Sequence, residues 1–155
     1  MPAPDPMTQL ELQAVLARYA KGLDRRDRQL FLSAFHTDGR LRIHSPATDP
    51  TPVSDRRGHG ELADVTDVIG RYAQTFHFLG QSAFQVDGDE ATGETHCLAH
   101  HLTVGPHGGE NLVMHIRYDE RLRRGDDGEW RFVDRGVMID WMDRRLAVPL
   151  GGLPR

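Results

Sequence analysis

Residues 111–141 have the sequence NLVMHIRYDERLRRGDDGEWRFVDRGVMIDW, and this segment carries the clearest structural signal in the chain. In its first part every second residue is apolar: Leu112, Met114, Ile116 and Tyr118. A period of two is typical of a half-buried β-strand. The GDDG that follows is a turn signal. We therefore predict an antiparallel hairpin whose apolar face lines a core or a pocket.

The segment before this hairpin continues the same pattern. Two further β-like stretches, 75–86 and 90–104, are separated from each other by DGD and from the hairpin by GPHGG. Glycine-rich turns of this kind connect antiparallel neighbours. We expect a meander of four strands: 75–86, 90–104, 111–124 and 130–143.

The first half of the chain has mostly helical periodicity. Thr8 and Glu11 have the spacing of a capping box, which predicts that a first helix begins at Thr8. Apolar residues at helical spacing extend this helix to about residues 23–26. Three more elements are expected: a short helix after Asp27, a strand at 39–44 and a helix at 61–74.

This order of elements, helix-helix-strand-helix and then four strands, predicts the α+β class. We expect a cone-shaped, curved, mixed or antiparallel sheet wrapped around three helices, with a pocket on its concave face. A single domain would span residues 8–144, between a disordered lead-in at 1–7 and a tail or partner-contacting arm at 145–155. The proline-rich loop at 45–60 has no periodicity, and we interpret it as a lid or a disordered flap.

Composition argues against several classes of function. A net charge of -4 and a pI near 6.1 disfavour nucleic acid or an anionic membrane as a partner. Lys21 is the single lysine and Cys97 the single cysteine, which disfavours Schiff-base chemistry and excludes an internal disulfide. The sequence shows no signal peptide and no membrane-length apolar run, so we expect a soluble, cytoplasmic protein.

Three motifs give the chain a family resemblance: ARYAKGLDRRD at 17–27, TFHFLGQ at 75–81 and GEWRFVDRGVMIDW at 128–141. They resemble segments of the SnoaL-like branch of the nuclear-transport-factor and ketosteroid-isomerase superfamily, in particular scytalone dehydratase and hexachlorocyclohexane dehydrochlorinase. The resemblance implies the cone fold over nearly the whole chain and a homodimer or homotrimer. It also implies that Asp24 serves catalysis and that His77 removes the substrate proton.

Taken alone, neither residue indicates a site, because an Asp at a helix end is usually solvated and a His in an apolar strand is usually structural. Asp24, however, lies beside the small Ala17 and Ala20 on the flank of the apolar stripe, so its carboxylate can reach inward. Paired with that carboxylate, His77 has a fixed tautomer and a stabilised imidazolium, as a general base requires. We therefore predict Asp24 and His77 as the catalytic pair.

A second histidine motif, AHH at 99–101, supplies further candidates. The family resemblance aligns His101 with a second active-site histidine, while His100 offers the same chemistry on the other face of the strand. His101, or Tyr19 one turn before Asp24, is expected to donate a hydrogen bond to a developing oxyanion or to a leaving oxygen. The expected substrate-binding residues are Tyr19, His100, Tyr118 and Met138.

We expect neither a metal nor a cofactor. His96 and His100 would lie about 13 Å apart on one strand, and His101 would point away from His100. No phosphate-binding glycine motif or serine-hydrolase elbow is present. The sequence predicts a dehydratase-like lyase acting on a small, largely apolar cyclic metabolite such as a polyketide or a steroid. An isomerase or cyclase with the same pair remains open, as does a non-catalytic binding or subunit-like module.

Overall fold

The computed structural model describes residues 3–148 and residue 150. Its elements, in chain order, are α1 (Pro6–Asp24), α2 (Arg28–Ser33), β1 (Phe35–His44), β2 (Ser54–Arg57), α3 (Gly58–Leu62), α4 (Asp64–Ile69), β3 (Gln74–Asp87), β4 (Glu90–Gly105), β5 (Gly108–Arg124) and β6 (Trp130–Ala147). The four strands expected in the second half of the chain are all present, with slightly longer bounds than the sequence indicated.

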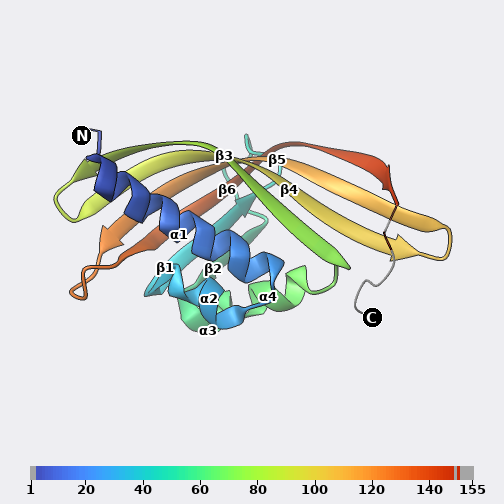
Figure 1. Cartoon of the computed structure of the whole chain (residues 1–155), viewed down its shortest axis with the longest axis horizontal. Coiled ribbons are helices and arrows are strands. Elements are labelled where there is room, and N and C mark those ends of the chain that lie inside the picture. The colour runs from blue at the N-terminus through green and yellow to red at the C-terminus, as the bar shows by residue number, and fades with distance from the viewer. Residues whose placement is uncertain (1–2, 149, 151–155) are drawn as a thin grey trace.

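One six-stranded sheet, with strand order β2-β1-β6-β5-β4-β3, forms the frame of the molecule. β1 pairs in parallel with β6, and the other neighbouring pairs are antiparallel. Figure 1 shows the sheet curving over the helices, with α1 crossing its concave side and the short helices gathered below. The predicted α+β fold, a curved mixed sheet wrapped around helices, is confirmed.

The middle of the chain differs from the prediction. The loop expected at 45–60 is shorter, because residues 54–57 form β2 and pair with β1. Three of the four residues of β2 are charged, so the sequence had no apolar pattern that could predict this strand. An ion pair between Arg40 and Asp55 holds β2 against β1. In place of one helix at 61–74 there are two short ones, α3 and α4, and Gly70 follows the second.

The two ends of the chain also differ from the prediction. α1 begins at Pro6, before the expected Thr8, because the side chain of Asp5 accepts hydrogen bonds from the N–H groups of Met7 and Thr8. Proline suits the first helical position, since its missing N–H has no partner to lose there. At the other end β6 continues to Ala147, so the first residues of the expected tail are strand. Residues 1–2, 149 and 151–155 lie outside the described part.

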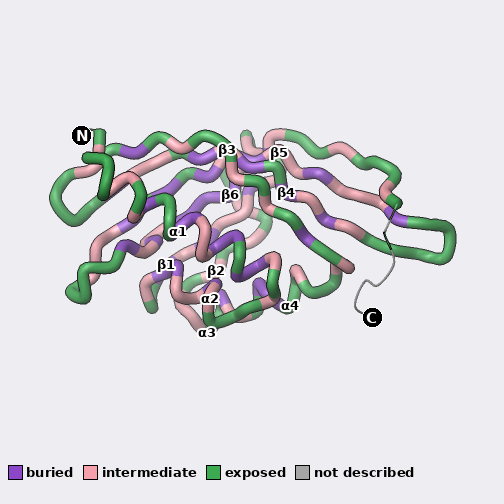
Figure 2. Tube along the Cα trace, in the orientation of Figure 1, coloured by how far each residue is buried: buried purple, intermediate pink, exposed green. Residues whose placement is uncertain are grey.

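The core forms where the apolar stripe of α1 meets the concave face of the sheet, and Figure 2 shows buried residues concentrated there. Tyr19 lies in an aromatic cluster with Phe31, Phe35 and Phe132, at ring-centroid distances of 5.4, 6.0 and 6.2 Å. At Gly22 a Cβ would lie 2.5 Å from the backbone nitrogen of Phe31. The close crossing of α1 and α2 therefore depends on glycine at this position.

A buried ion pair fills the interior below Tyr19. Arg135 and Glu120 are both fully buried, and their charged groups lie 3.0 Å apart. The guanidinium carbon lies 4.0 Å from the ring centre of Tyr19 and 3.8 Å from that of Tyr118, so aromatic faces cover the charge. This part of the interior is therefore packed with side chains.

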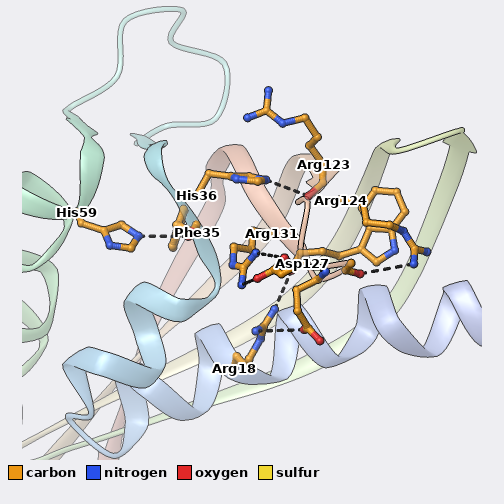
Figure 3. A network of polar contacts seen from close by, with 11 residues as sticks. Arg18, Phe35, His36, His59, Arg123, Arg124, Asp127 and Arg131 are labelled. Carbon is orange, nitrogen blue, oxygen red and sulfur yellow. Dashed lines mark hydrogen bonds and ion pairs between the residues drawn. The ribbon is translucent and has the colours of Figure 1, made fainter.

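Polar contacts fasten α1 to the hairpin of β5 and β6 (Figure 3). Arg18 donates to the carbonyl oxygen of Trp130 at 2.7 Å, and Arg124 donates to Glu11 at 3.0 Å. Within the turn region Asp127 accepts two hydrogen bonds from Arg131. These contacts set the direction of α1 across the sheet, and that direction brings the last residue of the helix to β3.

Candidate functional site

The last residue of α1 meets the first part of β3 through a hydrogen-bonded pair. The carboxylate of Asp24 accepts from Nδ1 of His77 through Oδ1 at 2.6 Å, and from the backbone N–H of His77 through Oδ2 at 2.9 Å. The side chains are largely covered, with exposed fractions of 5% for His77 and 21% for Asp24. Both oxygens of one carboxylate therefore hold the same histidine.

The position of β3 in the sheet explains this contact. β3 is the last strand in the order, so one of its edges has no neighbouring strand. The N–H of His77 lies on that open edge and donates to Asp24. A buried or half-buried backbone donor needs a partner, and the helix supplies one where the sheet cannot. The geometry of the sheet edge therefore fixes which residue of β3 receives the carboxylate.

Thr75 completes the surroundings of Asp24, and the sequence interpretation missed it. It lies two residues before His77, on the same face of β3, and its hydroxyl donates to Oδ1 of Asp24 at 2.9 Å. Burial acts to raise the pKa of Asp24, but the hydrogen bonds from His77 and Thr75 outweigh it and hold that pKa below its usual value. Asp24 is therefore ionised at neutral pH.

An ionised carboxylate can only accept hydrogen bonds, which assigns the tautomer of His77. Its Nδ1 carries the proton that points to Asp24, so in the neutral ring Nε2 is the basic nitrogen. Within the part of the chain that the structure describes, Nε2 has no hydrogen-bond partner. The arrangement can therefore accept a proton from a bound molecule.

His101 lies on the same face as His77. In the register of β3 and β4, Thr75 is opposite His101 and His77 is opposite Ala99, and the rings of the two histidines are 6.0 Å apart. His101 is 4% exposed, and burial, with a smaller contribution from its electrostatic interaction with His77, lowers its pKa to about 4. Its Nδ1 is buried without a partner among the described residues. His101 is therefore a neutral imidazole with one unused nitrogen beside the pair.

His100 points the other way. On the opposite face of the sheet its Nδ1 lies 2.8 Å from the amide nitrogen of Asn111, and its ring meets the edge of Phe76. The sequence left open which histidine of the AHH motif would face the pocket. The register places His101, not His100, beside His77.

The other predicted pocket residues lie at different depths. The ring of Tyr19 is 6.4 Å from that of His77, whereas Tyr118 lies deeper, 5.8 Å from Tyr19 and 1% exposed. Burial raises the pKa of Tyr19 to about 12, so its hydroxyl keeps its proton. Met138 is not brought to the pair: in β6 it lies opposite Arg117, while the preceding residue Val137 lies opposite Tyr118 on the inner face.

A cavity of about 460 Å³ reaches Asp24 and Thr75, but neither His77 nor His101 lines it. Its lining residues are Asp24, Gln74, Thr75, Phe76, His100, Leu102, Asn111 and Ala147. The volume falls in the range of small-molecule sites, and the lining combines three apolar residues with five polar or charged ones. His100, although it does not contact His77, therefore remains at the edge of space that a ligand can use.

Metal-binding groups and membrane-spanning helices are both absent from the described residues, 3–148 and 150. No group of three or more His, Cys, Asp or Glu side chains there has a geometry suited to a metal ion. No helix in that part of the chain is both long enough and apolar enough to cross a bilayer.

Solved structures share the fold over most of their length. A hexachlorocyclohexane dehydrochlorinase (LinA, type 2) has a TM-score of 0.78 at 16% identity, with 94% of each chain covered. A putative scytalone dehydratase from Novosphingobium aromaticivorans has a TM-score of 0.76 at 18% identity, covering 94% of this chain and 95% of that one. A protein of unknown function from Mycobacterium tuberculosis is 25% identical, with a TM-score of 0.72 over 86% of this chain and 72% of that one.

A comparison with curated proteins found no match. The model of the SnoaL-like domain, in contrast, matches residues 8–136, which is most of the chain and includes most of α1, the Asp24–His77 pair and the first part of β6. The chain therefore belongs to the SnoaL-like domain family.

Proposed function

We propose that this chain is a cofactor-free, dehydratase-like lyase in which His77, held by Asp24, acts as the general base. The family match and the neighbours named as a dehydrochlorinase and a putative dehydratase support a catalytic or ligand-binding role. The observation that carries the finer proposal is the 2.6 Å contact between Nδ1 of His77 and Oδ1 of Asp24, which leaves Nε2 bare. A neutral imidazole in this state is suited to accept a proton near neutral pH.

The proposed reaction begins when Nε2 of His77 takes a proton from the carbon next to a carbonyl of the substrate. The electron pair of that C–H bond forms an enolate, and it then becomes a C=C bond as the C–O bond at the β-carbon breaks. The departing hydroxide accepts the proton from His77 and leaves as water, which returns His77 to its neutral form. Asp24 stabilises the imidazolium in the interval, because its charge lies at the far side of the same ring.

The neutral neighbours of His77 suit the charge that develops on the substrate oxygen. His101 is uncharged at neutral pH, and Tyr19 keeps its hydroxyl proton. A neutral donor can hydrogen-bond the enolate oxygen and stabilise its charge. The hydrogen bond from Nδ1 of His77 to Asp24 is left unchanged. We assign His101 or Tyr19 to this role. As the substrate we propose a small cyclic metabolite of largely apolar character, for which Phe76, Leu102 and Ala147 offer apolar contacts in the cavity.

An isomerase or a cyclase is the second candidate, because the same base serves its first step. In that case the enolate is reprotonated at another carbon or attacks within the molecule, and no water is lost. The mass of the product separates the two readings. A non-catalytic binding module would neither remove water from the ligand nor rearrange it.

The function test follows α-proton exchange and water loss together. A panel of cyclic β-hydroxy ketones, beginning with β-hydroxycyclohexanone, is incubated with the protein in deuterium oxide and followed by mass spectrometry. We expect deuterium uptake and loss of water with the native chain, and a rate about 10²–10⁴ times lower in His77→Ala. Asp24→Asn should also lose rate. The exposed His107→Ala is the matched control and should keep it.

Full activity in both His77→Ala and Asp24→Asn would remove the proposed base. Deuterium uptake without water loss would select the isomerase or cyclase. Binding of the panel without any exchange would favour the non-catalytic module.

The low pKa of His101 gives a prediction about stability and pH. Its pKa falls from 6.5 to about 4 on folding, so the unfolded chain binds this proton first as the pH drops. The native chain should therefore lose up to about 3 kcal/mol of stability from this group between about pH 7 and about pH 4. His101→Phe should lack this part of the slope in urea denaturation at several pH values. Equal slopes would show that folding does not lower the pKa of His101.

We also propose a homodimer or homotrimer that forms through the outer face of the sheet. There, one cross-strand row contains Phe78, Leu98, His115 and Trp141. Phe78 is 57% exposed and Trp141 60%, although such large apolar groups are usually covered when they are contiguous. The row also lines a cavity of about 290 Å³ that lies apart from Asp24 and His77.

The proposed interface is tested by replacing apolar residues of this row with charged ones, which should prevent the subunits from associating. Light scattering after size exclusion should report a dimer or trimer for the native chain and a monomer for Phe78→Asp with Trp141→Asp. Val53→Asp, an equally exposed apolar position in the loop before β2, is the matched control and should leave the assembly intact. A native chain that is monomeric at high concentration contradicts this proposal.

A further inference from the structure

Arg26 connects three parts of the chain just beyond the end of α1. One guanidinium nitrogen, Nη1, donates to the carbonyl oxygen of Leu23 and to the hydroxyl of Thr75, both at 2.8 Å. The other, Nη2, donates to the carbonyl oxygen of Tyr72 at 3.2 Å. The side chain therefore ties the helix end, the segment before β3 and β3 itself to one rigid, planar group.

The backbone of Arg26 is also unusual. Its φ is 58°, and among the described residues it is the one residue other than glycine with a positive φ. A side chain in this region costs of order 1 kcal/mol, and glycine or asparagine normally occupies it. The contacts of the guanidinium with three elements offset this cost. A strained arginine beside the Asp24–His77 pair indicates that the side chain, and not the turn alone, is needed here.

The direction of the hydrogen bonds follows from the chemistry of the donors. A guanidinium has only donors, so Oγ1 of Thr75 must accept from Arg26. The single proton of that hydroxyl then points to Oδ1 of Asp24 at 2.9 Å. Oδ1 accepts a second hydrogen bond from Nδ1 of His77. Each bond in this chain polarises the next one, so the Arg26 charge acts on Asp24 through the hydroxyl.

We propose that Arg26 and Thr75 are positioning residues that keep the Asp24 carboxylate turned toward Nδ1 of His77, and so keep Nε2 of His77 bare. The inference rests on the proposed function, since a fixed tautomer is useful where Nε2 has to accept a proton. Without the Thr75 hydroxyl, Oδ1 loses the donor that holds its orientation, and Asp24 keeps only its two contacts with His77.

Three variants separate the guanidinium, the hydroxyl and the backbone. Arg26→Asn removes the guanidinium but keeps a residue that tolerates a positive φ, so the turn should survive. Thr75→Val removes the hydroxyl and keeps the shape of the side chain. Thr75→Ser is the conservative variant, because it retains the hydroxyl at the same branch point. Thermal denaturation and circular dichroism establish that each variant is folded.

The first readout is independent of any substrate. In protein labelled with ¹⁵N at the histidine rings, the Nδ1 proton of His77 is assigned by its absence in His77→Gln. We expect a low-field, slowly exchanging Nδ1 proton in the native chain. In Thr75→Val and Arg26→Asn this signal should broaden and move to higher field, and the ring nitrogens should show a mixture of tautomers. Thr75→Ser should restore the native spectrum.

The second readout is deuterium exchange into β-hydroxycyclohexanone. Thr75→Val and Arg26→Asn should lower kcat about tenfold with little change in KM, and Thr75→Ser should recover most of it. Unchanged spectra and unchanged kcat in both folded variants overturn the inference while leaving His77 as the base. If the native chain catalyses no exchange but the spectra change as described, the proposed function fails and the positioning contact stands.

Discussion

One carboxylate organises the candidate site. Asp24, at the end of α1, accepts hydrogen bonds from the ring and the backbone of His77 and from Thr75. It thereby gives a partner to the backbone N–H of His77 on the open edge of β3 and joins the helix to the sheet. It also places a proton on Nδ1 of His77. The fold makes this contact possible. The apolar stripe of α1 and its polar contacts with the β5–β6 hairpin set the direction of the helix. The curvature of the sheet then brings β3 to the C-terminal end of α1 (Figure 1).

The interior is divided along α1. Near Tyr19 the aromatic cluster and the Arg135–Glu120 pair pack the interior. Near Asp24, a neutral His101 with a buried, unpartnered Nδ1 lies beside His77, and a cavity of about 460 Å³ reaches Asp24 from the opposite face of the sheet. The packed interior around Tyr19 thus contributes stability, and the candidate site lies at the C-terminal end of α1. The same dyad geometry supports elimination, isomerisation and cyclisation, since all three begin with proton removal from carbon.

The sequence predicted those parts of the fold that depend on local patterns. The four long strands were recognisable from the period of two and the glycine turns, but β2 was not, because it is held by pairing and the Arg40–Asp55 ion pair. Asp24 and His77 could be singled out by resemblance. Thr75 and Arg26 could not, since their role appears only when the sheet edge meets the helix end. The face of Met138 was unpredictable because β6 has two irregularities of register, between Phe132 and Asp134 and between Ile139 and Trp141, and each shifts the side-chain alternation.

The contact between the two side chains can be measured directly by a double-mutant cycle. Unfolding free energies at neutral pH are determined for the native chain, Asp24→Ala, His77→Ala and the double variant. The backbone bond from residue 77 survives in His77→Ala, so the cycle isolates the bond from Nδ1 to Oδ1. We expect a coupling of about 1–3 kcal/mol, as for a hydrogen bond to a charged group. Effects that add within about 0.5 kcal/mol would show that the carboxylate does not hold the imidazole.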